Sequence, residues 1–169
     1  FCFFIFSLVF CKIAPSTPSC SSSTDFIFSL STLITEISAN VIVGEGSLLD
    51  DSKFRDKLEA AEIELTATEF TELRTLSQIS SGGAPGPESS ILKIKGTELQ
   101  QNISELFIEM LAYYSHPFLT ETELGSNESI GPDYAGAAMP HYLNFRKVSI
   151  YGGSNEIQRN VISKAILGL

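Results

Sequence analysis

The stretch Gly82-Gly83-Ala84-Pro85-Gly86-Pro87 separates two long runs of helical periodicity. Glycine readily ends a helix and proline cannot continue one, so a helix that reaches this stretch stops there. Two long helices joined by so short a connection must lie antiparallel, side by side. The stretch therefore predicts a helical hairpin at the centre of an up-and-down bundle.

The run before this stretch has the periodicity of a long amphipathic helix. Asp50 and Asp51 can accept hydrogen bonds from the first free amides, so we expect the helix to begin there and to end at about Ser80. Apolar residues recur largely at steps of three and four, and charged residues fill the opposite face. The expected buried positions are Phe54, Leu58, Ala61, Leu65, Leu73, Leu76 and Ile79.

The run after the stretch predicts a second long helix from about Glu88 to Ser115, closed by His116-Pro117. Its expected buried stripe consists of Ile91, Leu92, Leu99, Ile103, Leu106, Met110, Leu111 and Tyr114. Gly96 in mid-helix costs about 1 kcal/mol relative to alanine. It marks either a close crossing with another helix or a tolerated flaw.

The remaining C-terminal residues predict two shorter helices. A polar loop over residues 119–133 precedes a helix from about Tyr134 to Asn144, and a terminal helix follows. Residues 51–169 contain no alternating pattern typical of a strand. The predicted fold class is therefore all-α, an up-and-down helical bundle over residues 51–169.

The N-terminal residues differ in kind from this bundle. Residues 1–35 combine apolar runs with a segment rich in serine, threonine and proline, and residues 36–50 are predicted to form a linker. The first apolar run is too short to cross a bilayer and lacks the basic residues of a secretory signal. A secretory signal, a hydrophobic helix of the bundle and non-native coding sequence are three alternatives. We favour the third alternative and expect a truncated gene product. The chain does not begin with Met, and the composition of residues 1–35 differs from that of the predicted bundle.

Charge and cysteine content narrow the functional classes. The net charge of −9 on 169 residues argues against nucleic acid as a partner. Residues 141–169 carry four basic side chains and one acidic one, hence +3 against −12 elsewhere, which suits a small anionic ligand. All three cysteines lie before residue 21, so the body suits a reducing cytoplasm or organelle matrix, and we expect the cytoplasm. His116 and His141 stand apart from each other and from cysteine, so no metal site is expected.

The end of the chain, from Tyr151 onward, combines a glycine turn with a capped helix. Gly152 and Gly153 allow a tight turn, and either Ser154 or Asn155 can cap the helix that follows. If Asn155 is the cap, Gln158 can reach back to it. Ile157, Val161, Ile162, Ala165 and Ile166 form the expected apolar face, and Gly168 ends the helix. Such a helix start favours an anion.

Residues 151–160, Tyr-Gly-Gly-Ser-Asn-Glu-Ile-Gln-Arg-Asn, closely resemble the C-terminal signature of the acyl-CoA dehydrogenase family. These are FAD flavoproteins that desaturate acyl-CoA thioesters. Residues 69–74, 86–96 and 145–151 are similar to a bacterial branch of the family. The resemblance covers residues 51–169 and implies the family's C-terminal helical domain, so its N-terminal helical and β-barrel domains are expected outside this chain.

The resemblance also implies roles for the residues of the terminal turn. Gly153 matches the glycine near the acyl-CoA substrate. Ser154, Asn155 and Glu156 match positions that contact FAD, often across a subunit interface. Gly152 occupies the position of the catalytic glutamate of some relatives, and a glycine cannot abstract a proton. Arg159 can serve either an anion or a salt bridge.

No catalytic base can be assigned from the resemblance. Other relatives place their glutamate on the first helix of this domain, which would precede residue 51. Glu36 is the nearest acidic residue there, and its sequence context does not match. Residues 113–117 also replace a glycine-rich loop that helps hold the flavin pyrophosphate in many members.

Three functions follow from these observations. The first is the C-terminal part of an FAD-dependent acyl-CoA dehydrogenase, with acyl-CoA as substrate, an electron-transfer flavoprotein or similar acceptor, and a homo- or hetero-oligomeric assembly. This part alone is expected to be inactive. The second is a catalytically silent subunit of a hetero-oligomer, which Gly152 favours. The third is a helical interaction module. No membrane association is expected for any of them.

Overall fold

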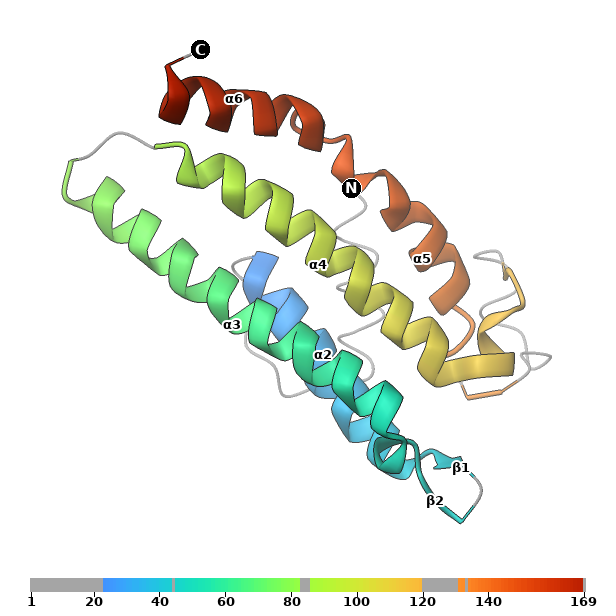
Figure 1. Cartoon of the computed structure of the whole chain (residues 1–169). Coiled ribbons are helices and arrows are strands. Elements are labelled where there is room, and N and C mark those ends of the chain that lie inside the picture. Colours follow the sequence, from blue (N-terminus) through green and yellow to red (C-terminus); the bar gives the residue numbers. More distant parts are fainter. Residues whose placement is uncertain (1–22, 44, 83–85, 120–130, 133, 169) are drawn as a thin grey trace.

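The computed structural model describes residues 23–43, 45–82, 86–119, 131–132 and 134–168. Within them lie five α-helices, three short 3₁₀ turns and one minimal hairpin, so the all-α prediction is confirmed (Figure 1). The α-helices are α2 (Ser23–Asn40), α3 (Ser52–Ser80), α4 (Glu88–Leu111), α5 (Ala138–Phe145) and α6 (Asn155–Leu167). The other elements are β1 (Ile42–Val43), β2 (Gly46–Ser47), η1 (Leu48–Asp50), η2 (Ala112–Ser115) and η3 (Arg146–Ser149).

The antiparallel pair α3 and α4 forms as the glycine and proline stretch predicts (Figure 1). Asp51 caps α3, since its carboxylate accepts a hydrogen bond from the Lys53 amide at 3.0 Å. Gly82 follows the end of α3 with φ of +86°, a conformation that glycine adopts without steric cost. The predicted start and end of this helix are therefore confirmed.

The core lies where α2, α3 and α4 meet, and α5 packs against it from the far side of α4 (Figure 1). Its buried apolar residues are Ile34, Phe54, Leu58, Ala61, Leu65, Leu99, Ile103, Leu106, Phe107, Met110, Leu111, Ala135 and Ala138. The predicted core positions at the end of α3, namely Leu73, Leu76 and Ile79, are exposed. In the described residues α2 reaches only the first part of α3, so no third helix covers these side chains.

Helix α2 crosses the boundary that the sequence places at residue 35. Ser31, Ile34 and Ser38 are buried on one face of α2, which packs against both α3 and α4. The predicted linker over 36–50 is therefore wrong, because it holds the end of α2, the hairpin and η1. Packing between helices has overridden the low helix propensity of this serine-rich segment. Residues 1–22, which the sequence assigns to the excluded segment, lie outside the described residues.

The first C-terminal helix begins later than the periodicity predicts. Helix α5 starts at Ala138 and continues as η3, whereas the expected helix starts at Tyr134. Between residues 51 and 168 the described chain forms no strand, in agreement with the prediction. In the same described part, every helix is too short or too polar to cross a lipid bilayer.

Candidate functional site

The terminal turn that carries the family-like signature is exposed and built on two glycines. Gly152 and Gly153 have φ of +64° and +88°, which side chains with a Cβ rarely adopt. A Cβ added at Gly152 would meet no atom within 4 Å, whereas one at Gly153 would lie 2.8 Å from Gln158 Nε2. That Gln158 amide donates to the carbonyl oxygen of Gly152 at 3.0 Å. The helix thus reaches back to hold the turn.

Ser154 is the residue that caps α6. Its hydroxyl oxygen accepts from the Ile157 amide at 3.5 Å, and Gly168 ends the helix in the left-handed conformation, as predicted. The alternative with Asn155 as cap is wrong, because Asn155 is already the first residue of the helix. Gln158 consequently bonds the turn before the helix instead of completing a capping box.

Asn155 is buried, with 7 % of its surface exposed, and its side chain contacts α4. The Thr97 hydroxyl has one proton, which it gives to the carbonyl oxygen of Ile94 at 2.9 Å. Thr97 therefore accepts from Asn155 Nδ2 at 3.3 Å, which leaves the Asn155 oxygen free to accept elsewhere. This assignment orients the Asn155 amide.

Lys93 on α4 supplies the donor for that oxygen. Its ammonium donates to Asn155 Oδ1 at 2.7 Å and to the carbonyl oxygen of Ser149 at 2.9 Å. These acceptors lie on the two sides of the glycine turn. A single side chain of α4 therefore clamps both ends of the segment that carries the signature.

Glu156 occupies the anion position at the start of α6. Hydrogen bonds from its own backbone amide and from the Ser154 hydroxyl lower the pKa of this carboxyl below its usual value. The positive end of the helix dipole favours a negative charge there. The anion that the sequence predicts at this helix start is thus already supplied by the chain.

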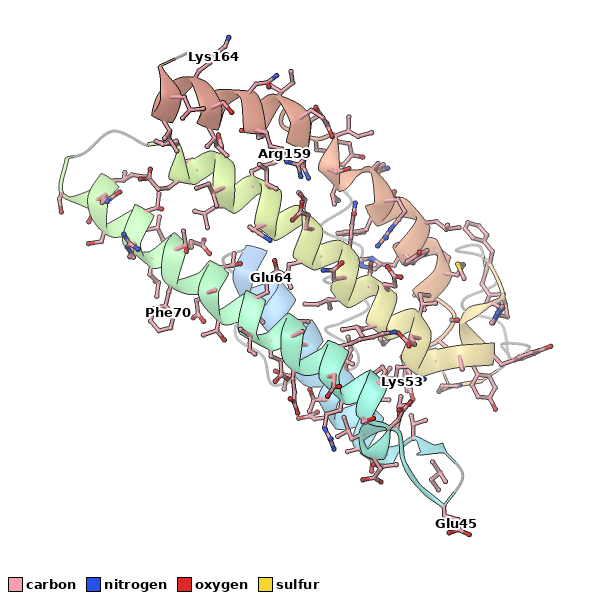
Figure 2. All side chains as sticks on the ribbon, viewed as in Figure 1. Glu45, Lys53, Glu64, Phe70, Arg159 and Lys164 are labelled. Carbon is pink, nitrogen blue, oxygen red and sulfur yellow. The ribbon has the colours of Figure 1, made fainter. Side chains whose placement is uncertain are left out.

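The basic side chains of residues 141–169 do not form a continuous patch. Arg146 forms an ion pair with Glu105 on α4 at 3.7 Å. Arg159, which lies between α6 and α4 (Figure 2), forms one with Glu98 on α4 at 3.2 Å. Lys147 lies 5.7 Å from the centre of the Tyr151 ring. Of the two roles left open for Arg159, the structure shows the salt bridge.

Sequence reasoning missed a polar stripe on α4 that holds the C-terminal segment. Lys93, Thr97, Gln101 and Ser104 all bond to α6 or η3, at spacings of four, four and three residues. Polar residues on a helix normally indicate a solvated face. The available signal was that three of the four are short or neutral side chains, which suit an interface better than open solvent.

Glu36, considered as a catalytic base, and residues 113–117, considered for the flavin pyrophosphate, lie on different elements. Glu36 is exposed on α2, which packs against α3 and α4. Residues 113–117 follow Ala112, whose φ of +46° makes it the one described non-glycine residue with positive φ. The backbone turn at this point therefore has the form that a glycine would adopt without strain.

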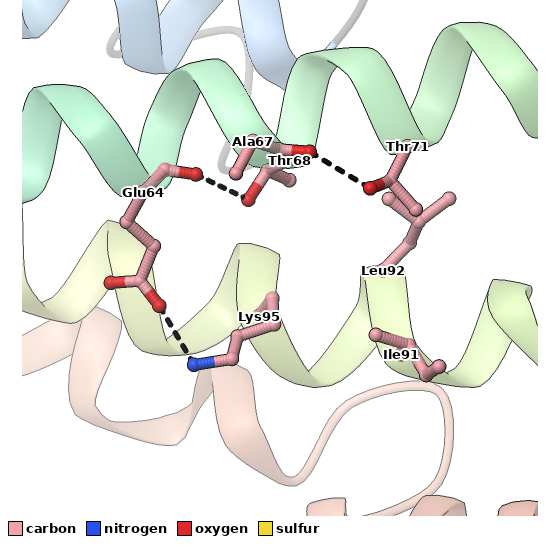
Figure 3. A pocket seen from close by; sticks show the side chains of 7 residues that line it. All are labelled: Glu64, Ala67, Thr68, Thr71, Ile91, Leu92 and Lys95. Carbon is pink, nitrogen blue, oxygen red and sulfur yellow. Dashed lines mark hydrogen bonds and ion pairs between the residues drawn. The ribbon is translucent and has the colours of Figure 1, made fainter.

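A shallow groove of about 280 Å³ runs between α3 and α4. Glu64, Ala67, Thr68, Thr71, Ile91, Leu92 and Lys95 line it (Figure 3). Lys95 pairs with Glu64 across the groove at 2.8 Å. No group of three metal-ligating side chains occurs among the described residues.

Solved structures with the same fold come from larger chains. The ChsE4-ChsE5 complex from Mycobacterium tuberculosis matches with a TM-score of 0.67 and 22% identity, over 86% of this chain and 36% of that one. Butyryl-CoA dehydrogenase from Megasphaera elsdenii matches with 0.66 and 14%, over 86% and 34%. The FAD complex of PigA matches with 0.67 and 17%, over 87% and 34%.

This chain therefore spans about a third of the length of the structures it matches. At these identities the likeness shows the fold alone. No curated protein matches the sequence closely enough to serve as a relative. The sequence model described as "Acyl-CoA dehydrogenase, C-terminal domain" matches residues 32–167, so the chain belongs to the family of acyl-CoA dehydrogenase C-terminal domains.

Proposed function

We propose that this chain is the C-terminal helical part of an FAD-dependent acyl-CoA dehydrogenase of the bacterial branch, acting in α,β-desaturation of an acyl-CoA thioester. The observation that carries the proposal is the exposed glycine turn before α6, held in shape from both sides by α4. Family membership over residues 32–167 supports the same assignment. The cytoplasm is the proposed compartment, since the chain beyond residue 20 contains no cysteine.

The groups at the turn fit the neutral polar parts of FAD better than its diphosphate. The Glu156 carboxylate is 76% exposed and can accept hydrogen bonds from hydroxyl or amino groups, but it repels phosphate. Ser154 adds a hydroxyl beside it. When bound, the flavin supplies the hydride acceptor for desaturation. We assign Ser154 and Glu156 to direct contact with the cofactor.

Asn155 and Gly153 have different proposed roles at the same turn. Asn155 serves FAD binding by holding the turn to α4, because its amide is buried and already paired with Thr97 and Lys93. Gly153 leaves its backbone open to the acyl-CoA substrate, since it presents no side chain. Both residues therefore support the ligands through the shape of the backbone.

A second candidate function is the catalytically silent subunit of a hetero-oligomer. Gly152 favours it, because the position where some relatives keep the catalytic glutamate has no side chain. Among the matched structures, the ChsE4-ChsE5 complex contains two different chains. In either assembly we propose an electron-transfer flavoprotein or similar protein as the electron acceptor.

Purification of the intact gene product tests the proposal directly. We expect a yellow protein with a flavin absorption spectrum that bleaches under anaerobic conditions when an acyl-CoA is added. Bleaching that requires a co-purified second subunit would support the silent subunit. A colourless protein that forms a stable monomer and takes up no added FAD would overturn both and favour a helical interaction module.

A further inference from the structure

We propose that Lys93 is a positioning residue that sets the geometry of the turn over residues 150–154. The inference deepens the proposed function and rests on it for the ligand. Neither the family signature nor the helical periodicity assigns a role to Lys93. Its assignment comes from the contacts between α4 and the C-terminal segment.

The contacts of Lys93 bracket the turn. The Ser149 carbonyl oxygen lies directly before residue 150, and Asn155 lies directly after residue 154. Lys93 is 56 and 62 positions away from them in sequence, so these bonds exist only in the folded chain. One ammonium group therefore bonds directly to both ends of a five-residue segment.

The partners of Lys93 are neutral oxygen atoms. Among the described residues no carboxylate forms an ion pair with it, in contrast to Lys95, which pairs with Glu64 and Glu98. The Glu156 carboxylate interacts with the Lys93 charge through space, without a hydrogen bond. A cation that is partly removed from water costs free energy unless hydrogen bonds replace its hydration. The two short bonds at 2.7 and 2.9 Å do so, and they make the position of the carbonyl and of Asn155 depend on the cation.

The neighbouring contacts show why removal of the Lys93 ammonium would change the conformation of the exposed turn. Without the ammonium, Asn155 keeps only its bond to Thr97, at the longer distance of 3.3 Å. The Ser149 carbonyl loses the Lys93 bond that ties it to α4. Gln158 still bonds Gly152, but it belongs to α6 and moves together with the turn. Residues 150–154 would then become mobile relative to α4.

Lys95 provides a matched control on the same helix. It has the same side chain two positions away, and its ammonium bonds Glu64 on α3 at 2.8 Å instead of the terminal segment. The variants are Lys93→Met, which keeps the side-chain stem and removes the charge, Lys93→Arg, which keeps the charge, and Lys95→Met. All three are made in the intact gene product, the form for which FAD binding is proposed.

Hydrogen exchange of the flavin-free protein is the deciding measurement, because it needs no ligand. We expect Lys93→Met to speed the exchange of the hydrogen-bonded amides in residues 150–157, those of Ile150, Tyr151 and Ile157, about tenfold. The factor is set by the loss of a charged hydrogen bond. Amides of the α3 core around Phe54 and Leu65 should keep their wild-type rates, which shows that the fold is intact. Lys95→Met should leave residues 150–157 unchanged, and Lys93→Arg should restore most of their protection.

FAD titration of the same variants tests the consequence for the ligand. We expect Lys93→Met to raise the dissociation constant of FAD about tenfold, and Lys95→Met to leave it within about twofold of wild type. Equal exchange of residues 150–157 in Lys93→Met and wild type would overturn the inference. So would faster exchange with unchanged FAD affinity.

The two proposals fail in different ways. If wild type takes up no FAD, the proposed function is overturned, while the exchange data still decide whether Lys93 holds the turn. If Lys93→Met does not fold, Lys93→Gln replaces it, since a neutral amide keeps one donor and removes the charge. Selective loss of protection in residues 150–157 would support the inference in that variant too.

Discussion

Gln101 and Arg146 each donate a hydrogen bond to the main-chain carbonyl oxygen of the other. Arg146 Nη2 lies 2.7 Å from the Gln101 oxygen, and Gln101 Nε2 lies 3.1 Å from the Arg146 oxygen. Arg146 also donates to Ser104 Oγ at 2.9 Å and lies 4.3 Å from the centre of the Tyr142 ring. These contacts hold η3 against α4, so the chain enters the glycine turn at a defined place.

Replacement of Arg146 should destabilise the protein far more than replacement of an exposed arginine. Arg146→Met is expected to lower the free energy of unfolding by about 2 kcal/mol, because it removes two charged hydrogen bonds. Arg55→Met removes an exposed pair with Glu59 at 3.6 Å and should cost about 0.5 kcal/mol or less. Urea denaturation measures both, and equal losses would contradict the role of Arg146.

Gly96 destabilises α4, and replacement by alanine should stabilise the helix. No atom lies within 4 Å of a Cβ added at Gly96, so the close crossing considered from the sequence is absent there. Gly96→Ala should therefore raise the free energy of unfolding by about 1 kcal/mol. Gly82→Ala also meets no atom, but its φ of +86° should make it destabilising by about 1 kcal/mol. Urea denaturation should therefore give changes of opposite sign in the free energy of unfolding for the two variants. A loss of stability in Gly96→Ala would show that a Cβ at this position is not accommodated.

Gly153 and Gln158 should be energetically coupled. An alanine at Gly153 displaces Gln158 Nε2 and thereby its bond to the Gly152 carbonyl oxygen, in addition to the backbone strain at φ of +88°. Gly153→Ala is expected to cost about 2 kcal/mol in wild type and about 1 kcal/mol in a Gln158→Ala background. A double-mutant cycle by thermal unfolding measures the difference. Additive losses would show that Gln158 does not hold the turn.

His141 should make stability depend on pH between about 4 and 6.5. Burial lowers the pKa of His141 from 6.5 to about 4, so the unfolded chain binds the proton first as pH falls. Its contribution is present above pH 6.5 and is lost progressively down to about pH 4, up to roughly 3 kcal/mol. In His141→Gln, the free energy of unfolding measured by urea denaturation should change less between pH 6.5 and pH 5 than in wild type. Carboxylates titrate below this range and should not obscure the difference. An unchanged slope in that variant would refute the assignment to His141.

Local signals were sufficient to predict the α3–α4 hairpin. Asp51 and Gly82 act through backbone chemistry within a few residues, so their effect can be read without knowledge of the fold. The same holds for Ser154 and Gly168, which cap and end α6. The choice between Ser154 and Asn155 was open because both are good caps in isolation, and only the contact of Asn155 with α4 decides it.

The helical periodicity predicted buried side chains correctly only where another helix packs alongside. The periodicity of α3 continues unchanged from Phe54 to Ile79, yet Phe54 is 2% exposed and Ile79 is 41% exposed. The difference depends on how far α2 extends alongside α3, which is a property of the packed structure. Similarly, Ile157 and Val161 form the predicted apolar face of α6, but that face is exposed in the described chain because α6 meets α4 through polar groups.

The helical class, the central hairpin and the family signature at residues 151–160 could be identified from the amino-acid order alone, because capping, periodicity and motif identity are short-range properties. The tertiary structure decided which side chains hold that signature in place. Lys93 lies 62 residues before Asn155, and no local pattern relates them. Their contact follows from the packing of α4 against α6, since a hydrogen bond of 2.7 Å requires both helices to be in position before it can form.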